Sequence, residues 1–287
     1  MKRAFIPVVT VVAVIFALWY GVAVALNAPW AYDQAKRGQV ELSFSELVVE
    51  TWSQKKPKLP APHQVGAEIW KTTVQKKVTS KRSLIYHAGI TLSSTMLGFV
   101  LGTVLGIGLA VGIVYNRVMD MSVMPWVIAS QTIPILAIAP MIIVVLNAVG
   151  ISGLLPKAII SMYLSFFPVV VGMVKGLRSP GVMQLDQMKT WSASGGQEFW
   201  KLRLPSSMPY LFASLKIAMA ASLVGAIVGE LPTGAVAGLG ARLLAGSYYG
   251  QTIQIWSALI MAAALAACLV AIIGVIQRIT LKRMGMA

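Results

Sequence analysis

The chain has 287 residues, of which 57% are hydrophobic and 11% are charged, and its formal net charge is +15 at pH 7. Soluble domains carry about 25% charged residues, so this composition is typical of a membrane protein and argues against a soluble enzyme or a nucleic-acid-binding module. The single cysteine, Cys268, excludes an internal disulfide. No P-loop, HExxH or Ser-His-Asp pattern is present, so we predict no catalytic residue, bound cofactor or metal site.

Six apolar stretches are long enough to cross a membrane as helices, which requires about 20 residues at a rise of 1.5 Å per residue. They cover residues 4–27, 87–114, 123–149, 155–177, 209–231 and 253–276. Each stretch is continuously apolar and lacks the period-2 alternation of a barrel strand. The sequence therefore predicts an all-α polytopic membrane protein of six transmembrane helices.

The placement of Lys and Arg orients these spans, because cytoplasmic loops are enriched in cations. With the amino terminus inside, the cytoplasmic segments hold ten Lys or Arg, whereas the short outer loops hold only Lys157 and Arg242. The first outer segment, residues 28–86, also carries ten and disagrees with the rule. The rule weakens for loops of about 60 residues, so we keep this orientation.

The first span has two interpretations. Lys2-Arg3, an apolar run and AVA at 23–25 together form the pattern of a cleaved signal peptide. The apolar run is long for a signal peptide, which favours an uncleaved membrane anchor. Both interpretations give the other five spans the same orientation.

Small residues in the second span indicate close helix packing. Glycines recur every four residues at 98, 102 and 106, and again at 108 and 112. This spacing places them on one face of a helix, where another helix backbone can approach closely.

The third span is expected to be broken. Proline removes a backbone hydrogen bond, so Pro134 and Pro140 are predicted to bend or unwind the helix. Broken helices at membrane depth often line a pathway, where the polar side chains of Gln131, Thr132 and Asn147 could meet a solute. The alternative is that these three polar side chains bond between helices.

Glu230 lies at the outer end of the fifth span, inside GELPTG. A charged side chain at the bilayer centre costs about 2.5 kcal/mol or more, and less near the interface. We therefore expect this carboxylate to face protein, water or a partner rather than lipid.

The polar stretch WSASGGQEFWKLRLP, residues 191–205, separates the fourth and fifth spans. We predict a short helix over 184–194, a turn at Gly195-Gly196 and a second helix over 197–204 that ends at Pro205. Leu185, Met188 and Trp191 share one face of the first helix. The residues alone leave two interpretations open, a docking surface and an amphipathic hairpin on the lipid surface.

This stretch resembles the EAA loop of binding-protein-dependent ABC transporter permeases, which forms a coupling helix that sits in a cleft of the ATPase subunit. The EAA triplet falls on Asp186, Gln187 and Met188, and the motif glycine falls on Ser192. Both the triplet and the glycine position depart from the family's motif, so the strength of coupling to the ATPase stays open. The ATPase-docking loop implied by the resemblance comprises Asp186, Gln187, Met188, Ser192, Ala193, Ser194, Gly195, Gly196, Trp200, Leu204 and Pro205.

Further motifs resemble the same family in the same order over about residues 59–280. They are HAGITLSSTMLGFVLGTVLGIGLAVG, IPILAIAPMIIV, FFPVVVGMVKGL and VGAIVGELPTGAVAGLGARL. LPAP at 59–62 resembles the LPSP of the branch that imports nitrate, sulfonates, taurine or pyrimidine precursors. The resemblance implies a five-helix type I importer core plus an N-terminal helix.

The implied layout is an N-terminal transmembrane helix (1–27), an extracytoplasmic polar segment (28–86) and a permease core (87–280) with a cytoplasmic coupling loop (178–208). Residues 33–58 look like an insertion relative to the family, and within them LSFSELVVETW is the one amphipathic piece. No function is predicted for this inserted region.

The resemblance implies the permease subunit of a bacterial ABC importer in the inner membrane. Its partners would be two ATPase subunits, which bind the ATP, a periplasmic binding protein that delivers a small organic anion or pyrimidine-like solute, and a second, identical or similar permease. Alternating access would move the solute. The expected path or gate residues are Gln131, Thr132, Pro134, Pro140, Asn147 and Glu230. An acid recurs at the last position in the family, which implies a gate or a contact with the binding protein, and a plain structural role is the alternative.

Two rival functions would each require polar residues within the spans. An ion-coupled secondary transporter, working without an ATPase, would need intramembrane carboxylates or histidines, and Glu230 is the main candidate. A membrane-embedded enzyme would need acids, histidines or metal ligands clustered at one depth, and the spans supply none.

Overall fold

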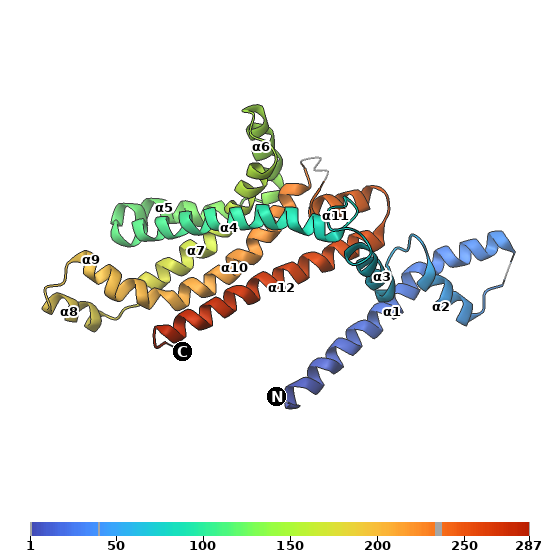
Figure 1. Cartoon of the computed structure of the whole chain (residues 1–287), viewed down its shortest axis with the longest axis horizontal. Helices are drawn as coiled ribbons and strands as arrows, with labels where there is room; N and C mark the ends of the chain where they lie inside the picture. The colour runs from blue at the N-terminus through green and yellow to red at the C-terminus, as the bar shows by residue number, and fades with distance from the viewer. Residues whose placement is uncertain (1, 40, 233–236, 287) are drawn as a thin grey trace. The chain divides into compact units, whose positions relative to one another are not determined.

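The computed structural model describes residues 2–39, 41–232 and 237–286, and these residues form helices and connecting turns without any strand (Figure 1). The all-α prediction is therefore confirmed. The helices are α1 (Lys2–Gly38), α2 (Phe44–Ser53), α3 (Pro62–Thr73), α4 (Leu84–Tyr115), α5 (Arg117–Ser130), α6 (Ile135–Ala148), α7 (Leu154–Leu177), α8 (Val182–Thr190), α9 (Gly195–Glu198), a π-helical turn (Phe199–Arg203), α10 (Leu204–Glu230), α11 (Leu239–Tyr248) and α12 (Thr252–Arg283).

The chain forms two compact units. The first contains the residues up to His87 together with Ala241–Met261, and the second contains Ala88–Gly240 together with Ala262–Ala287. Five helical segments in the described residues are long and apolar enough to cross a membrane, and α5 with α6 is a sixth candidate if that bent pair is counted as one span. This matches the predicted number of spans.

The third predicted span is two helices that meet at an angle of 99° (Figure 1). The break covers residues 131–134, and Pro134 precedes the first turn of α6, where its missing N–H costs nothing. Pro140 lies inside α6, so the helix is not unwound at this second proline. Membrane helices tolerate an internal proline when neighbouring groups satisfy the freed carbonyl.

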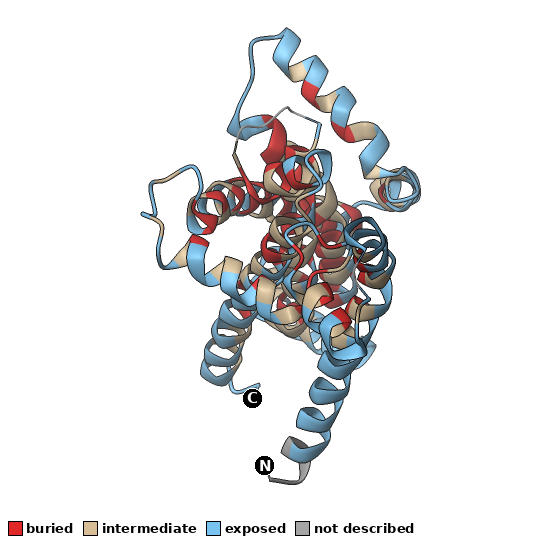
Figure 2. Ribbon diagram, turned by 90° about the vertical axis from the view of Figure 1, so that its right-hand side faces the viewer, coloured by how far each residue is buried: buried red, intermediate tan, exposed pale blue. Residues whose placement is uncertain are grey.

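Helix α1 continues beyond Asn27 to Gly38, so AVA at 23–25 lies within a helix. Its amino-terminal portion is apolar yet exposed (Figure 2), with Ile6 71% and Leu18 62% accessible. An exposed apolar surface of this kind is expected for a helix that contacts lipid.

The inserted region folds back onto α1 in the first unit. The buried Asn27 side chain donates to the carbonyls of Thr51 (3.3 Å) and Leu59 (2.8 Å), and its Oδ1 accepts from the backbone N–H of Lys58 (2.8 Å). The amphipathic piece forms α2, which buries Leu47. A buried asparagine with its capacity filled in this way fixes the path of residues 51–59 along α1.

Glycines of α4 allow α7 to approach in the second unit. A Cβ added at Gly106 would lie 2.7 Å from Cβ of Val169, and Gly98 and Gly102 are similarly close to α7. The first glycine series is therefore a packing face, as predicted. The second series, Gly108 and Gly112, does not form a packing face. No described atom lies within 4 Å of a Cβ added at Gly108, and a Cβ added at Gly112 would meet only the flexible Met119 side chain.

This contrast makes a paired prediction within one helix. Gly106→Ala is expected to destabilise the protein by about 1–3 kcal/mol, because the added methyl group overpacks the α4–α7 contact. Gly108→Ala is expected to be neutral or stabilising, since alanine is the better helix former and nothing obstructs its Cβ. Thermal unfolding of the purified variants measures both effects, and equal unfolding temperatures would contradict the packing role of Gly106.

Helices α7 and α10 form the most extensive helix–helix contact of the second unit. The Ser161 and Ser222 hydroxyls lie 2.6 Å apart, and Ser222 Oγ donates to the Thr95 carbonyl (2.8 Å). A Cβ at Gly225 would come within 2.7 Å of Cα of Ser161. Small residues and hydroxyl hydrogen bonds therefore join α4, α7 and α10, as is usual where lipid removes the hydrophobic drive for association.

Candidate functional site

The polar stretch after α7 forms a helix–turn–helix, as predicted, but with different boundaries. Helix α8 ends at Thr190, and Ser192 has a left-handed φ of +54°. Ser194 caps the second helix: its Oγ accepts from the Gln197 N–H (3.3 Å), and its N–H donates to Gln197 Oε1 (2.9 Å). The turn is therefore at 191–193, and the prediction of a turn at Gly195-Gly196 is wrong, because this capping box starts the helix there.

Ser192 occupies the position of the motif glycine. A left-handed backbone costs most residues about 1–2 kcal/mol and glycine almost nothing. The positive φ therefore gives a physical reason for glycine at this position in the motif. In this chain serine adopts the left-handed conformation.

The second helix does not end at Pro205. Residues Phe199–Arg203 form a π-helical turn in which Leu204 N–H bonds to the Phe199 carbonyl, and the chain then continues as α10. The wider π-helical turn leaves space for the ring of Pro205, which in a regular α-helix would clash with the carbonyl four residues earlier. The α8–α9 loop is thus continuous with a membrane-spanning helix.

Helices α8 and α9 lie beyond the ends of α7 and α10 (Figure 1). Met183 (85%), Trp191 (68%) and Trp200 (68%) are largely exposed. A hollow of about 470 Å³ lies between the two short helices. It is lined by Gln184, Gln187, Met188, Trp191, Ala193, Gln197, Lys201 and Leu202. Exposed aromatic side chains beside a concave surface are typical of a protein-docking site.

The remaining predicted docking residues have different environments. Asp186 is exposed and pairs with Lys189 at 2.9 Å, on the same side of α8. Leu204 and Pro205 are half-buried at the start of α10 and belong to the helix rather than to the exposed surface.

Arg203 joins this loop to the membrane helices. Its Nε lies 2.5 Å from Glu198 Oε1, one terminal nitrogen donates to the carbonyl of Leu177 at the end of α7 (2.9 Å), and its guanidinium lies 5.8 Å from the Tyr115 ring at the end of α4. The sequence did not indicate this cluster, because residues five apart are not neighbours on a regular α-helix. Pro205, which follows Arg203 by two residues, was the local signal that the regular α-helix would be interrupted there.

A second ion pair lies at the same end of the bundle. Arg178, just after α7, pairs with Asp120 of α5 at 2.8 Å. The end of α7 is therefore bonded both to the α8–α9 loop through Arg203 and to the first half of the broken span through Arg178.

Glu230 is fully buried at the end of α10, as expected for a carboxylate kept away from lipid. Thr91 Oγ1 of α4 donates to both of its oxygens (2.9 and 3.1 Å), and the Gly240 N–H donates to Oε2 (2.7 Å). Lys157 of α7 adds a favourable electrostatic interaction. The carboxylate therefore joins three helices to the start of α11.

The chain after the undescribed residues is held closely against Glu230. Leu239 N–H donates to Thr91 Oγ1 (2.8 Å), and Gly238 has a φ of +128°. A Cβ at Gly238 would overlap the Glu230 carboxyl group, so only glycine fits there. Part of the GELPTG motif and of the following outer loop, residues 233–236, lies outside the described residues.

The polar residues of the third span are not gathered around Glu230. Gln131, Thr132 and Asn147 are exposed, and Thr132 Oγ1 bonds to its own segment, at the Ala129 carbonyl (2.8 Å). Pro134 and Pro140 are exposed too. The interhelical bond at this break comes from α7, where the Tyr163 hydroxyl donates to the Ser130 carbonyl.

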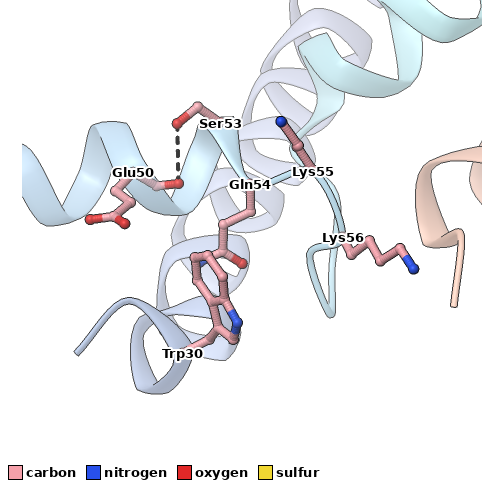
Figure 3. Close-up of a pocket in the computed structure, with 6 residues that line it drawn as sticks. All are labelled: Trp30, Glu50, Ser53, Gln54, Lys55 and Lys56. Atoms are coloured by element: carbon pink, nitrogen blue, oxygen red, sulfur yellow. Dashed lines mark hydrogen bonds between the residues drawn. The ribbon is translucent and has the colours of Figure 1, made fainter. Parts of the chain in front are cut away.

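A hollow of about 550 Å³ in the first unit is lined by Trp30, Glu50, Ser53, Gln54, Lys55 and Lys56. Figure 3 shows the Gln54 side chain alongside the Trp30 indole, whereas the side chains of Lys55 and Lys56 point in other directions. Its polar groups do not converge, so it lacks the arrangement of a solute site. Among the described residues no group of three or more acids, histidines or cysteines could hold a metal ion.

Residues 102–286 match the family of binding-protein-dependent transport system inner membrane components. The chain belongs to this family. The permease is therefore a multi-pass subunit of the inner membrane, and ATP is hydrolysed by a partner ATPase rather than by this chain. The family's name also implies a binding protein as a second partner.

Three similar proteins carry transport permease names. A probable ABC transporter permease protein of Haemophilus influenzae is 30% identical over 210 residues, covering 73% of this chain and 80% of its own. The formylaminopyrimidine transport permease protein of Halalkalibacterium halodurans is 33% identical, with coverages of 63% and 68%. The riboflavin transport system permease protein of Chloroflexus aurantiacus is 32% identical, with coverages of 78% and 80%.

Proposed function

We propose that this permease forms the translocation path for a small solute, by alternating access driven at the α8–α9 loop. The observation that carries the proposal is the link from that loop to the membrane helices. The loop runs without interruption into α10, and Arg203 bonds it to the end of α7. A push from an ATPase seated on α8 and α9 would therefore move membrane helices directly. Family membership also favours ATP-driven transport over the ion-coupled alternative.

We assign the path to the broken α5–α6 span and the gate to the Glu230 cluster, which comprises Glu230, Thr91 and Gly240. Helix α6 exposes Leu136 (64%), Met141 (67%) and Val144 (67%), and its polar residues Gln131 and Asn147 are exposed as well. A second permease chain, identical or similar, would cover this face and complete the path. Two ATPase subunits would then dock on the two loops.

In this arrangement residues 1–27 form the N-terminal membrane helix, 28–86 lie outside the cytoplasm and 87–280 form the core. The loop 178–208 faces the cytoplasm and the Glu230 cluster faces outward, where the binding protein would dock.

Arg242 in α11 is half-buried near Glu68. Burial lowers the pKa of its guanidinium, and the Glu68 carboxylate raises it. Arginine keeps its positive charge at any physiological pH.

We propose a small nitrogen heterocycle as the solute, ahead of a small organic anion. Relatives named for formylaminopyrimidine and riboflavin transport are 33% and 32% identical to this chain. Thermal shifts of the partner binding protein with formylaminopyrimidine, riboflavin and an alkanesulfonate would compare these classes. A shift with the sulfonate alone would overturn the heterocycle proposal.

The docking proposal is tested with Trp191→Glu. Trp191 lines the hollow, is 68% exposed and follows the last turn of α8, so a carboxylate there should disturb docking rather than folding. We expect at least a tenfold loss of ATPase subunit in co-purification with the permease, since a buried aromatic anchor contributes about 2 kcal/mol or more to a protein interface.

The matched control is Tyr248→Glu, which changes an aromatic residue on α11 that is also largely exposed, at 79%. It should leave ATPase co-purification unchanged. Full ATPase recovery with Trp191→Glu, or a wild-type permease that purifies without an ATPase, would instead support a hairpin on the lipid surface.

A further inference from the structure

A basic connector, residues 70–82, comprises the last turn of α3 and the turns that lead to α4, and the proposed function does not use it. Its cations are Lys71, Lys76, Lys77, Lys81 and Arg82. No acidic residue lies between Glu68 and Asp120 in the sequence, and in the part of the chain that the structure describes none of the five cations forms an ion pair. The connector therefore carries an uncompensated positive charge.

The connector follows a defined path. Ser80 N–H donates to the Lys77 carbonyl and Ser83 N–H to the Ser80 carbonyl, both at 2.9 Å. The imidazole Nε2 of His87, in the first turn of α4, lies 3.0 Å from the Lys81 carbonyl. Two successive turns and this ring contact hold the cations directly beside the start of α4.

The length of α4 places this start at the membrane surface. Its 32 residues span about 48 Å at 1.5 Å per residue. The hydrocarbon core and both headgroup layers together measure about 40–45 Å. A helix of this length therefore begins near the level of the lipid headgroups, and so does the connector that precedes it.

Exposed apolar side chains alternate with the cations. Trp70 (60%), Val74 (58%) and Val78 (55%) are accessible in the same segment. Tryptophan is enriched at membrane–water interfaces, and basic residues interleaved with apolar ones are typical of segments that lie in the headgroup layer. An acidic protein would complement the charges, but the depth of the connector favours lipid.

We propose that the connector binds the headgroups of anionic phospholipids in the leaflet that α4 enters. The cations contact the phosphates, while the three apolar side chains insert at the boundary of the acyl chains. In the orientation proposed above this is the outer leaflet, which gives a reason for cations in an outer segment. The proposal itself holds for either orientation.

The test compares two triple variants of the full-length permease. One is Lys77→Gln, Lys81→Gln and Arg82→Gln in the connector. The control is Lys55→Gln, Lys56→Gln and Lys58→Gln, which removes the same charge from exposed residues near α2. Native mass spectrometry of each protein, titrated with phosphatidylglycerol or phosphatidylcholine in detergent, counts the lipids that stay bound.

We expect the connector variant to bind phosphatidylglycerol at least tenfold more weakly than the control, and to lose most of the salt dependence of that binding. Phosphatidylcholine binding should be equal in both. Equal phosphatidylglycerol binding would overturn the proposal. So would a connector variant that keeps its lipid but no longer binds the partner binding protein, since that result assigns the connector to a protein contact.

Discussion

Replacing Glu230 with alanine is expected to lower the free energy of unfolding by about 2 kcal/mol or more and to abolish stimulation of ATP hydrolysis by the binding protein. The Thr91 hydroxyl and the Gly240 N–H would lose their acceptor in a buried site, and each unsatisfied group costs about 1–3 kcal/mol. Thermal unfolding and ATPase stimulation in proteoliposomes measure the two effects.

Glu230→Gln separates a gate from a structural role. Glutamine keeps the shape and one acceptor oxygen but removes the charge that attracts Lys157. We expect a smaller loss of stability than with alanine, together with a large loss of stimulation. The exposed Glu41→Ala is the control and should change neither quantity. If stimulation fell only in proportion to stability in both variants, Glu230 would be structural and the gate assignment would be wrong.

Replacing Arg203 with methionine is expected to uncouple ATP hydrolysis from transport without releasing the ATPase. Hydrogen bonds to charged groups contribute about 1.5–3 kcal/mol each, and Arg203 makes two, to Glu198 and to the Leu177 carbonyl. A loss of this size corresponds to at least a tenfold drop in stimulation by the binding protein. The docking surface that we propose around Trp191 and Met183 does not include Arg203, so the ATPase should still co-purify.

The control for this prediction is Lys282→Met, which removes an exposed cation at the end of α12. Arg178→Met should give a milder loss, because its pair with Asp120 is more exposed than the pair of Arg203 with Glu198. An Arg203→Met complex that keeps full stimulation would show that the docking loop moves α10 without help from α7. Loss of the ATPase itself would assign Arg203 to docking instead.

The sequence alone determined the class of protein and the positions of its helices. Hydrophobicity and length are local properties, and a bilayer of fixed thickness converts them directly into spans, so the apolar runs predicted α4, α7, α10 and α12 to within several residues at most ends. The burial of Glu230 also followed from the sequence, because a carboxylate is too costly to leave in lipid. Motif order further indicated the permease family.

Only the tertiary structure decided which side chains meet. Thr91 lies 139 residues before Glu230, and nothing local in the sequence pairs them. Gly106 and Gly108 look equivalent in sequence, yet only Gly106 faces α7. The physical reason is that hydrophobic patterning fixes where a helix runs, whereas its rotation and its neighbours depend on packing between distant segments, where polar groups must also find partners.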